Sequence, residues 1–104
     1  MYVHAGFEAR EQVKELDKLQ TLDIAKLRSP TKAFKAQLNR LQTNLRVEND
    51  TFNEEFIKSD GIGKILNLLS RMGVAGSEDT TWIAVGLRCL TYTFVYLTGV
   101  NYLR

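Results

Sequence analysis

The stretch SPTKAFKAQLNRLQTNLR, residues 29–46, is the part of the sequence that decides the fold. Its large apolar residues recur at separations of four, three and four, which places them on one stripe of an α-helix. They are Phe34, Leu38, Leu41 and Leu45. Before them, Ser29 offers a capping hydroxyl and Pro30 suits a first helical position. The pattern predicts an amphipathic helix that ends at about Arg46 and buries one face.

The same helical periodicity continues on both sides of this stretch. We expect further helices at about 7–19, 22–27, 51–58, 62–72 and 79–98. No segment alternates apolar and polar residues in the way that a half-buried strand does. The sequence therefore predicts four or more helices and no sheet, with these side chains in the core: Leu38, Leu41, Leu45, Ile65, Leu69, Leu90 and Phe94.

Glycines and short polar residues mark the expected helix boundaries. The sequence predicts a turn at Ser59-Asp60-Gly61, in which Gly61 is able to take a positive φ because it has no Cβ. Residues 73–77 are expected to form a loop, and Gly99 to end the last long helix, so that 100–104 begin another one. The expected helix caps are Asn49 or Asp50, and Ser77 or Asp79.

Short helices that alternate with longer apolar ones favour an all-α fold of the armadillo or HEAT kind, an α-solenoid fragment, with a compact helical bundle as the alternative. We expect residues 1–37 to be a helical lead-in and residues 38–104 to be armadillo-like repeats. Because such repeats run to about 40–47 residues, the chain holds only two to two and a half of them. This predicts a segment truncated from a larger array.

Composition argues against an enzyme. The 104 residues are 44% apolar and 25% charged, with a net charge of +2, as in an ordinary soluble chain. A single cysteine, Cys89, and a single histidine, His4, exclude a disulfide framework and the common cysteine- and histidine-based zinc sites. Glu54 and Glu55 are adjacent, so on a helix they point about 100° apart and do not converge on a substrate. We expect no catalytic residue, no metal and no cofactor.

The apolar segment 82–100 is long enough to suggest a membrane span. Arg88 near its centre argues against insertion, because an arginine at mid-bilayer costs about 2.5–3.5 kcal/mol. We expect instead a helix buried in protein, with Arg88 capping a neighbouring helix or pairing with an acid. With no signal peptide at the start, the sequence predicts a cytoplasmic protein. The many apolar faces of this helix also suggest a homodimer or packing against further repeats.

Basic residues run through the lead-in and the first clean helix: Lys26, Arg28, Lys32, Lys35, Arg40 and Arg46. They are interpreted either as a solvated face or as a surface that steers the chain toward an acidic partner or an anionic membrane. They have no aromatic platform between them, so nucleic acid is not an expected partner.

Three stretches together resemble the N-terminal regulatory region of Diaphanous-related formins. The first is LNRLQTNLR, residues 38–46, which is similar to that family's leucine helix before a polar turn. The second is FNEEFIKSDGIGKILNLL, residues 52–69, and the third is LRCL, residues 87–90, followed by Gly99-Val100. The turn at 47–50 lacks the family's proline, and Phe52 stands where a tryptophan is usual. Other armadillo-like scaffolds, including the engulfment and motility adaptors and the helical regions of giant deubiquitinases, are the alternatives.

The resemblance implies a cytoskeleton-associated module that binds an active Rho-family GTPase and takes part in autoinhibition of an actin-assembly factor. It also implies an intramolecular autoregulatory segment elsewhere in the parent chain as a partner. The positions that match the family's contact turn are Thr43, Asn44, Arg46, Val47 and Asn49. The alternative function is a scaffold repeat that binds a helical peptide or protein without any dependence on a GTPase.

Overall fold

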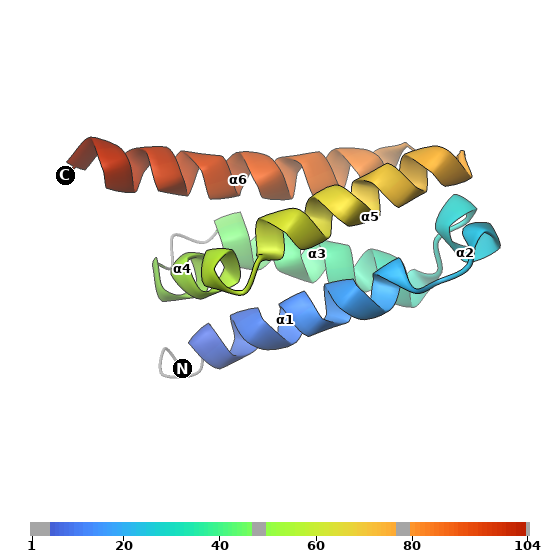
Figure 1. The fold of residues 1–104 in the computed structure, drawn as a ribbon, viewed down its shortest axis with the longest axis horizontal. Helices are drawn as coiled ribbons and strands as arrows, with labels where there is room; N and C mark the ends of the chain where they lie inside the picture. The colour runs from blue at the N-terminus through green and yellow to red at the C-terminus, as the bar shows by residue number, and fades with distance from the viewer. Residues whose placement is uncertain (1–4, 47–49, 77–79, 104) are drawn as a thin grey trace.

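The computed structural model describes residues 5–46, 50–76 and 80–103, with side chains as far as residue 99, and within these ranges it contains helices and no strand. All-helical structure is therefore confirmed for the described residues. The helices are α1 (Ala5–Gln20), α2 (Ile24–Arg28), α3 (Lys32–Arg46), α4 (Asp50–Lys58), α5 (Gly61–Ala75) and α6 (Thr81–Leu103) (Figure 1).

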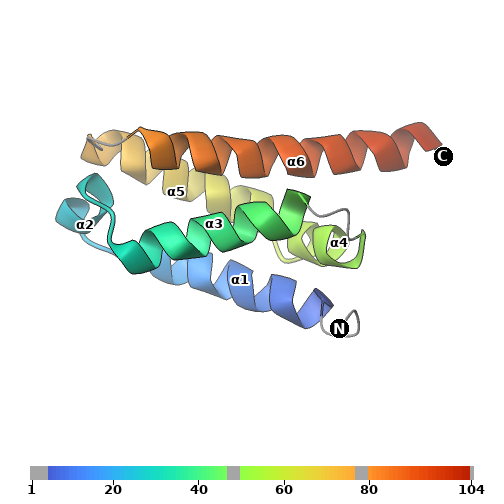
Figure 2. The same cartoon turned by 180° about the vertical axis from the view of Figure 1, so that it is seen from behind.

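The helices pack into an elongated body with extents of 43 × 26 × 18 Å. Figures 1 and 2 show α6 along one edge, with α5 and α3 beneath it and α1 on the far side. The most extensive contacts join α1 to α4 and α3 to α6, so helices that are distant in sequence pack together. This arrangement is compatible with a bundle and with a solenoid fragment. The division predicted between residues 37 and 38 falls inside α3 and stays a prediction.

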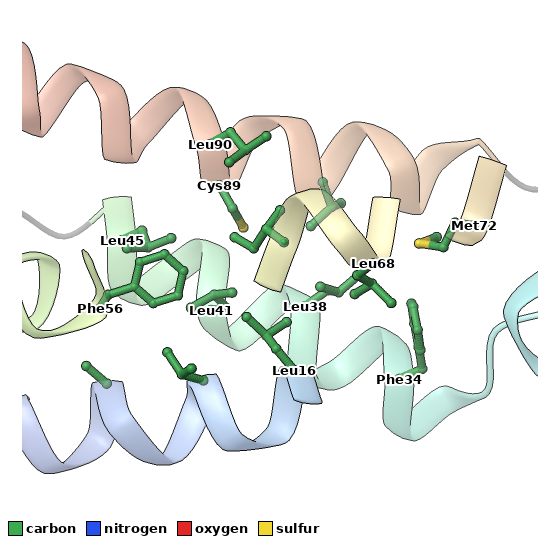
Figure 3. Close-up of a cluster of buried hydrophobic side chains, with 14 of the residues drawn as sticks. Leu16, Phe34, Leu38, Leu41, Leu45, Phe56, Leu68, Met72, Cys89 and Leu90 are labelled. Carbon is green, nitrogen blue, oxygen red and sulfur yellow. The ribbon is translucent and has the colours of Figure 1, made fainter. Parts of the chain in front are cut away.

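The core is built around the stripe of α3, as its periodicity predicts (Figure 3). Leu38, Leu41 and Leu45 are all buried, and Phe34 lies on the same face. Around them lie buried side chains from the other helices, among them Leu16, Phe56, Ile65, Leu68, Met72, Cys89 and Leu90. The predicted burial of Ile65 and Leu90 is confirmed, whereas Leu69 is only partly buried and packs against the core beside Gly86.

The sequence prediction is wrong about Phe94, one of the two α6 residues that it places in the core. Phe94 is half exposed, whereas Val85, Cys89 and Thr93 make the inner face. Because α6 is apolar on nearly every side, its periodicity does not distinguish the buried face from the exposed one. Gly99 does not end the helix either, since α6 continues to Leu103. A glycine inside a helix costs only about 1 kcal/mol relative to alanine, which is not enough to stop a long helix.

The start of α3 also differs from the prediction. The helix begins at Lys32, and the Thr31 Oγ1 accepts a hydrogen bond of 3.2 Å from the backbone N–H of Phe34. Thr31 is therefore the capping residue, and Ser29 and Pro30 lie before the cap. Ser29 instead follows the end of α2, where its N–H donates to the carbonyl of Ala25.

Two turns around α5 have an unexpected backbone. Asp60, not Gly61, takes the left-handed conformation, with φ of 63°. Gly61 is the first residue of α5 and is buried. At the other end, the residues predicted as a loop from position 73 stay helical through Ala75, and Gly76 caps the helix with φ of 69°. The predicted caps Asn49, Ser77 and Asp79 lie outside the described residues, and Asp50 is the first residue of α4.

Three side chains connect α5 with α1, α2 and the segment between them through hydrogen bonds to backbone carbonyls. Gln20 Nε2 donates to Lys64 O at 3.0 Å, and Arg71 donates to Leu22 O at 3.0 Å. Arg28 Nε donates to Ala75 O at 3.0 Å, in the last turn of α5. Carbonyls there have no partner within the helix, so Arg28 satisfies a group that would otherwise need water.

Candidate functional site

The candidate site from the resemblance lies at the C-terminal end of α3. Thr43 and Arg46 are exposed, and Asn44 is partly buried, whereas Val47 and Asn49 lie outside the described residues. Thr43 and Arg46 are three residues apart, so they are neighbours on the surface of the helix. The structure therefore brings together two of the five predicted contact residues on one exposed face.

Packing on the opposite side of α3 holds this face in place. Leu41 and Leu45 are buried with 1% and 3% of their surface exposed, against neighbouring core side chains. The hydroxyl of Thr43 donates to the carbonyl of Asn39 at 3.0 Å, so it is already bonded within the helix. A partner would meet a helix end whose backbone is already formed, whereas the exposed Arg46 side chain would still have to be ordered on binding.

Arg46 is the charged group at this helix end. It lies in the last turn of α3, where a positive charge interacts favourably with the helix dipole. Within the described part of the chain, no acidic side chain forms an ion pair with it. The surface can therefore offer a cation and hydrogen-bonding groups to an acidic protein surface, which is a binding chemistry and not a catalytic one.

The other basic residues do not form a single patch with Arg46. Arg40 forms an ion pair with Glu8, and Arg28 is bonded to the end of α5. Lys35 lies over the ring of Trp82, with its Nζ 5.8 Å from the ring centroid, in a cation–π contact. Lys26 and Lys32 are exposed. The interpretation as one steering surface is weakened, because half of the set has partners within the fold.

Arg88 does not take the structural role that the sequence predicts. It is exposed, and it forms no ion pair with another described residue. Arg28 is the arginine that bonds to the end of a neighbouring helix. An arginine in an apolar helix could not be assigned a partner from sequence because the partner depends on which face is buried.

Potential catalytic groups are separated or protected. Cys89 is fully buried, and burial raises the pKa of its thiol to about 12, so the thiolate that acts as a nucleophile is not formed near neutral pH. Glu54 pairs with Lys58 and Glu55 with Arg10, so these adjacent carboxylates engage different cations. Across the described residues, no group of three His, Cys, Asp or Glu side chains is arranged to hold a metal ion. His4 lies outside the described residues.

The sequence predicts an exposed apolar surface on the last long helix but not its residues, and the structure shows exposed apolar side chains on the outer face of α6. A shallow, open depression there is lined by Thr91, Phe94, Val95, Thr98 and Gly99. Its signal in the sequence is a second apolar stripe on α6, on the side opposite Cys89 and Thr93. The sequence prediction places Phe94 in the core, so it does not identify Phe94 as part of this exposed stripe.

Comparisons with protein-family models, with curated proteins and with solved structures found no match to this chain. In the described ranges, no helix is both long enough and apolar enough to cross a lipid bilayer, and this includes the described part of α6.

Proposed function

We propose that this chain is a non-enzymatic regulatory module that binds the GTP-loaded form of a Rho-family GTPase through the end of α3, in the manner of a formin regulatory region. The observation that supports this best is the exposed surface of Thr43 and Arg46, on the side of α3 opposite the buried Leu41 and Leu45. This surface coincides with the positions to which the sequence resemblance assigns the contact turn.

The proposed mechanism is a competition between two partners. In the closed state, an autoregulatory segment elsewhere in the parent protein occupies the module and holds an actin-assembly domain inactive. A GTPase in its GTP form binds the module and shifts the population toward the open state. Such a shift requires that the GTPase bind the open state more tightly than the closed one. Because the GTP-bound and GDP-bound forms of the GTPase differ in the conformation of their switch regions, we expect strong nucleotide dependence.

Arg46→Glu tests the proposed contact directly. We expect this variant to lose about ten- to thirtyfold in affinity for a GTPase loaded with a GTP analogue, the usual range for a central contact. The measurement is isothermal titration of several Rho-family proteins, each in the GTP-analogue and the GDP form. Arg88→Glu is the matched control, because Arg88 is a similarly exposed arginine on a different helix and is expected to leave binding unchanged.

Val47→Asp tests residues 47–49, which the resemblance predicts to be part of the contact turn. We expect it to weaken binding while circular dichroism shows unchanged helicity, whereas a core variant such as Leu41→Asp would lose binding by unfolding. If no GTPase binds the wild-type protein in a nucleotide-dependent way, the effector function is wrong. The scaffold function, in which the module binds a helical partner regardless of nucleotide, would then take its place.

A further inference from the structure

The helix α6 has two different apolar faces. Its inner face packs on the body of the protein through Cys89 and Thr93, both with 0% of their surface exposed. On the other side of the same helix, Leu87 is 53%, Phe94 50% and Val95 65% exposed. Figures 1 and 2 agree that the remaining helices all lie on one side of α6, so its outer face has no neighbour among the described helices.

The outer face has the spacing of a coiled-coil seam. Ala84, Leu87, Thr91, Phe94 and Thr98 are separated by three, four, three and four residues. This is the heptad spacing with which helices pair through interlocking side chains. The pattern is independent of the inner face, whose buried residues Val85, Cys89 and Thr93 are already in contact with the core. The outer seam is therefore available to another helix.

Thr91, at the centre of this seam, does not introduce an unsatisfied polar group. Its hydroxyl donates to the carbonyl of Leu87 at 3.0 Å, one turn earlier in the same helix. With the hydroxyl bonded inside α6, the Thr91 methyl group is the part of the side chain available for packing. Thr91 and Thr98 also line the shallow depression beside Phe94, so small residues alternate with a protruding ring.

The charge of α6 favours an uncharged partner surface. From Thr81 to Leu103 the helix contains no acidic residue, and its single basic residue is Arg88. A strongly acidic or basic partner would find almost no complementary charge along the seam. A second copy of the same face is complementary to it in polarity, provided that the two Arg88 side chains do not face each other.

We propose that the outer face of α6 binds the same face of a second copy of this chain, as an antiparallel helix pair. In this arrangement Phe94 packs against the partner's Thr91, and Leu87 against the partner's Thr98. Large residues then face small ones, which allows the two layers to interlock. A parallel pair in register would instead place Phe94 against Phe94 and Arg88 against Arg88, which combines poor packing with like-charge repulsion.

The size of the seam indicates a weak dimer. From Ala84 to Thr98 the helix rises about 21 Å, and a helix is about 10 Å wide. A contact of this size falls short of the roughly 800 Å² that each partner buries in a standard interface. We therefore expect a reversible dimer with a dissociation constant in the micromolar range. The proposal does not depend on the GTPase function, which uses the end of α3.

Sedimentation velocity of the whole chain from about 1 µM to 1 mM tests the association. We expect a concentration-dependent shift from monomer to dimer, which Val95→Glu weakens by at least tenfold. Val74→Glu is the matched control, because Val74 is 81% exposed on α5, away from the seam. Circular dichroism verifies that each variant stays helical. A helical wild type that is monomeric at 1 mM overturns the proposal, and the face then belongs to another occupant. The proposal is also overturned if Val95→Glu and Val74→Glu weaken the dimer equally.

Cysteine cross-linking tests the antiparallel register. Leu87→Cys mixed with Thr98→Cys should give a disulfide-linked dimer that neither variant gives alone at the same concentration. A parallel pair would instead link each variant to itself, and this result would contradict the proposal. The native Cys89 does not interfere, because it is fully buried.

Discussion

The ring of Phe56 fills the space in which a side chain on Gly61 would begin. An ideal Cβ on Gly61 would lie 2.5 Å from the Cε1 and Cζ atoms of that ring. Phe56 is itself fully buried, so its ring cannot move aside into solvent. Asp60, the residue before Gly61, takes the left-handed conformation. The chain turns there from the end of α4 into the first residue of α5. Position 61 therefore needs glycine for close packing and not for its own backbone angles.

Gly61→Ala should destabilise the protein by about 1–3 kcal/mol, the usual cost of adding an atom to a filled core. The measurement is the free energy of unfolding from urea titration followed by circular dichroism. Gly73→Ala is the matched control on the same helix, because nothing lies within 4 Å of a Cβ placed there. We expect that control to stabilise the protein by about 0.5–1 kcal/mol. Equal effects of the two substitutions would contradict the role assigned to the Phe56 ring.

Thr31→Ala should lower the free energy of unfolding by about 1 kcal/mol, because it removes the side-chain oxygen that accepts the Phe34 N–H. Ser29→Ala should change it by less than about 0.5 kcal/mol, since Ser29 is exposed and lies before the cap. Thermal or urea unfolding of the two variants side by side makes the comparison. A larger loss of stability from Ser29→Ala than from Thr31→Ala would mean that Ser29 is the capping residue, as the sequence alone suggests.

Arg28→Ala should destabilise the protein by about 1 kcal/mol, because the carbonyl of Ala75 loses its partner at the end of α5. The effect is modest because Arg28 is largely exposed and water can replace part of the bond. Arg88→Ala removes an equally long, exposed side chain from α6 and should be nearly neutral. Hydrogen exchange gives a second readout, in which protection should fall mainly in the last turn of α5. Uniform loss of protection along the chain would argue against a local role.

Cys89 should be unreactive in the folded protein. Burial raises the pKa of its thiol from 9.0 to about 12, so the folded state holds the thiol proton more tightly than the unfolded chain does. Its contribution to stability is complete below about pH 9 and is lost as the pH rises through about 12. Ellman's reagent at pH 8 should modify the thiol only after urea unfolding. A Thr91→Cys variant, exposed on the same helix, should gain one fast-reacting thiol, and a fast reaction of wild type would disprove the burial.

The buried face of a helix could be predicted where one face is clearly apolar and the other clearly polar. The stripe of Leu38, Leu41 and Leu45 determines both the existence of α3 and the face that it buries. In α6 the same reasoning identifies a helix but not its inner face, because apolar residues lie on both sides, such as Val85 on the inner face and Phe94 on the outer one. The positions of α3, α4 and α5 decide which of those residues are covered.

Local backbone chemistry was harder to predict. Glycine is the residue expected at a positive φ, yet Asp60 takes that conformation. Gly61 follows it as the first residue of α5, where the absence of a Cβ allows the Phe56 ring to pack closely. For the candidate site, the resemblance assigned Thr43 and Arg46 to a contact surface, which stays a prediction, and the structure shows that both residues are exposed. The bond of Arg28 to the end of α5 and the exposure of Arg88 could not be predicted, since both depend on contacts between helices that are distant in sequence.

The contacts of α1 have a consequence for synthesis on the ribosome. This helix packs on α4 and α5, so its buried Val13 and Leu16 have no complete binding surface until α5 has been made. At about 5–20 residues per second, translation from Gln20 to Ala75 takes about 3–11 s. During that interval the apolar stripe of α1 is exposed on the nascent chain, where it is a natural target for a chaperone that binds short hydrophobic segments.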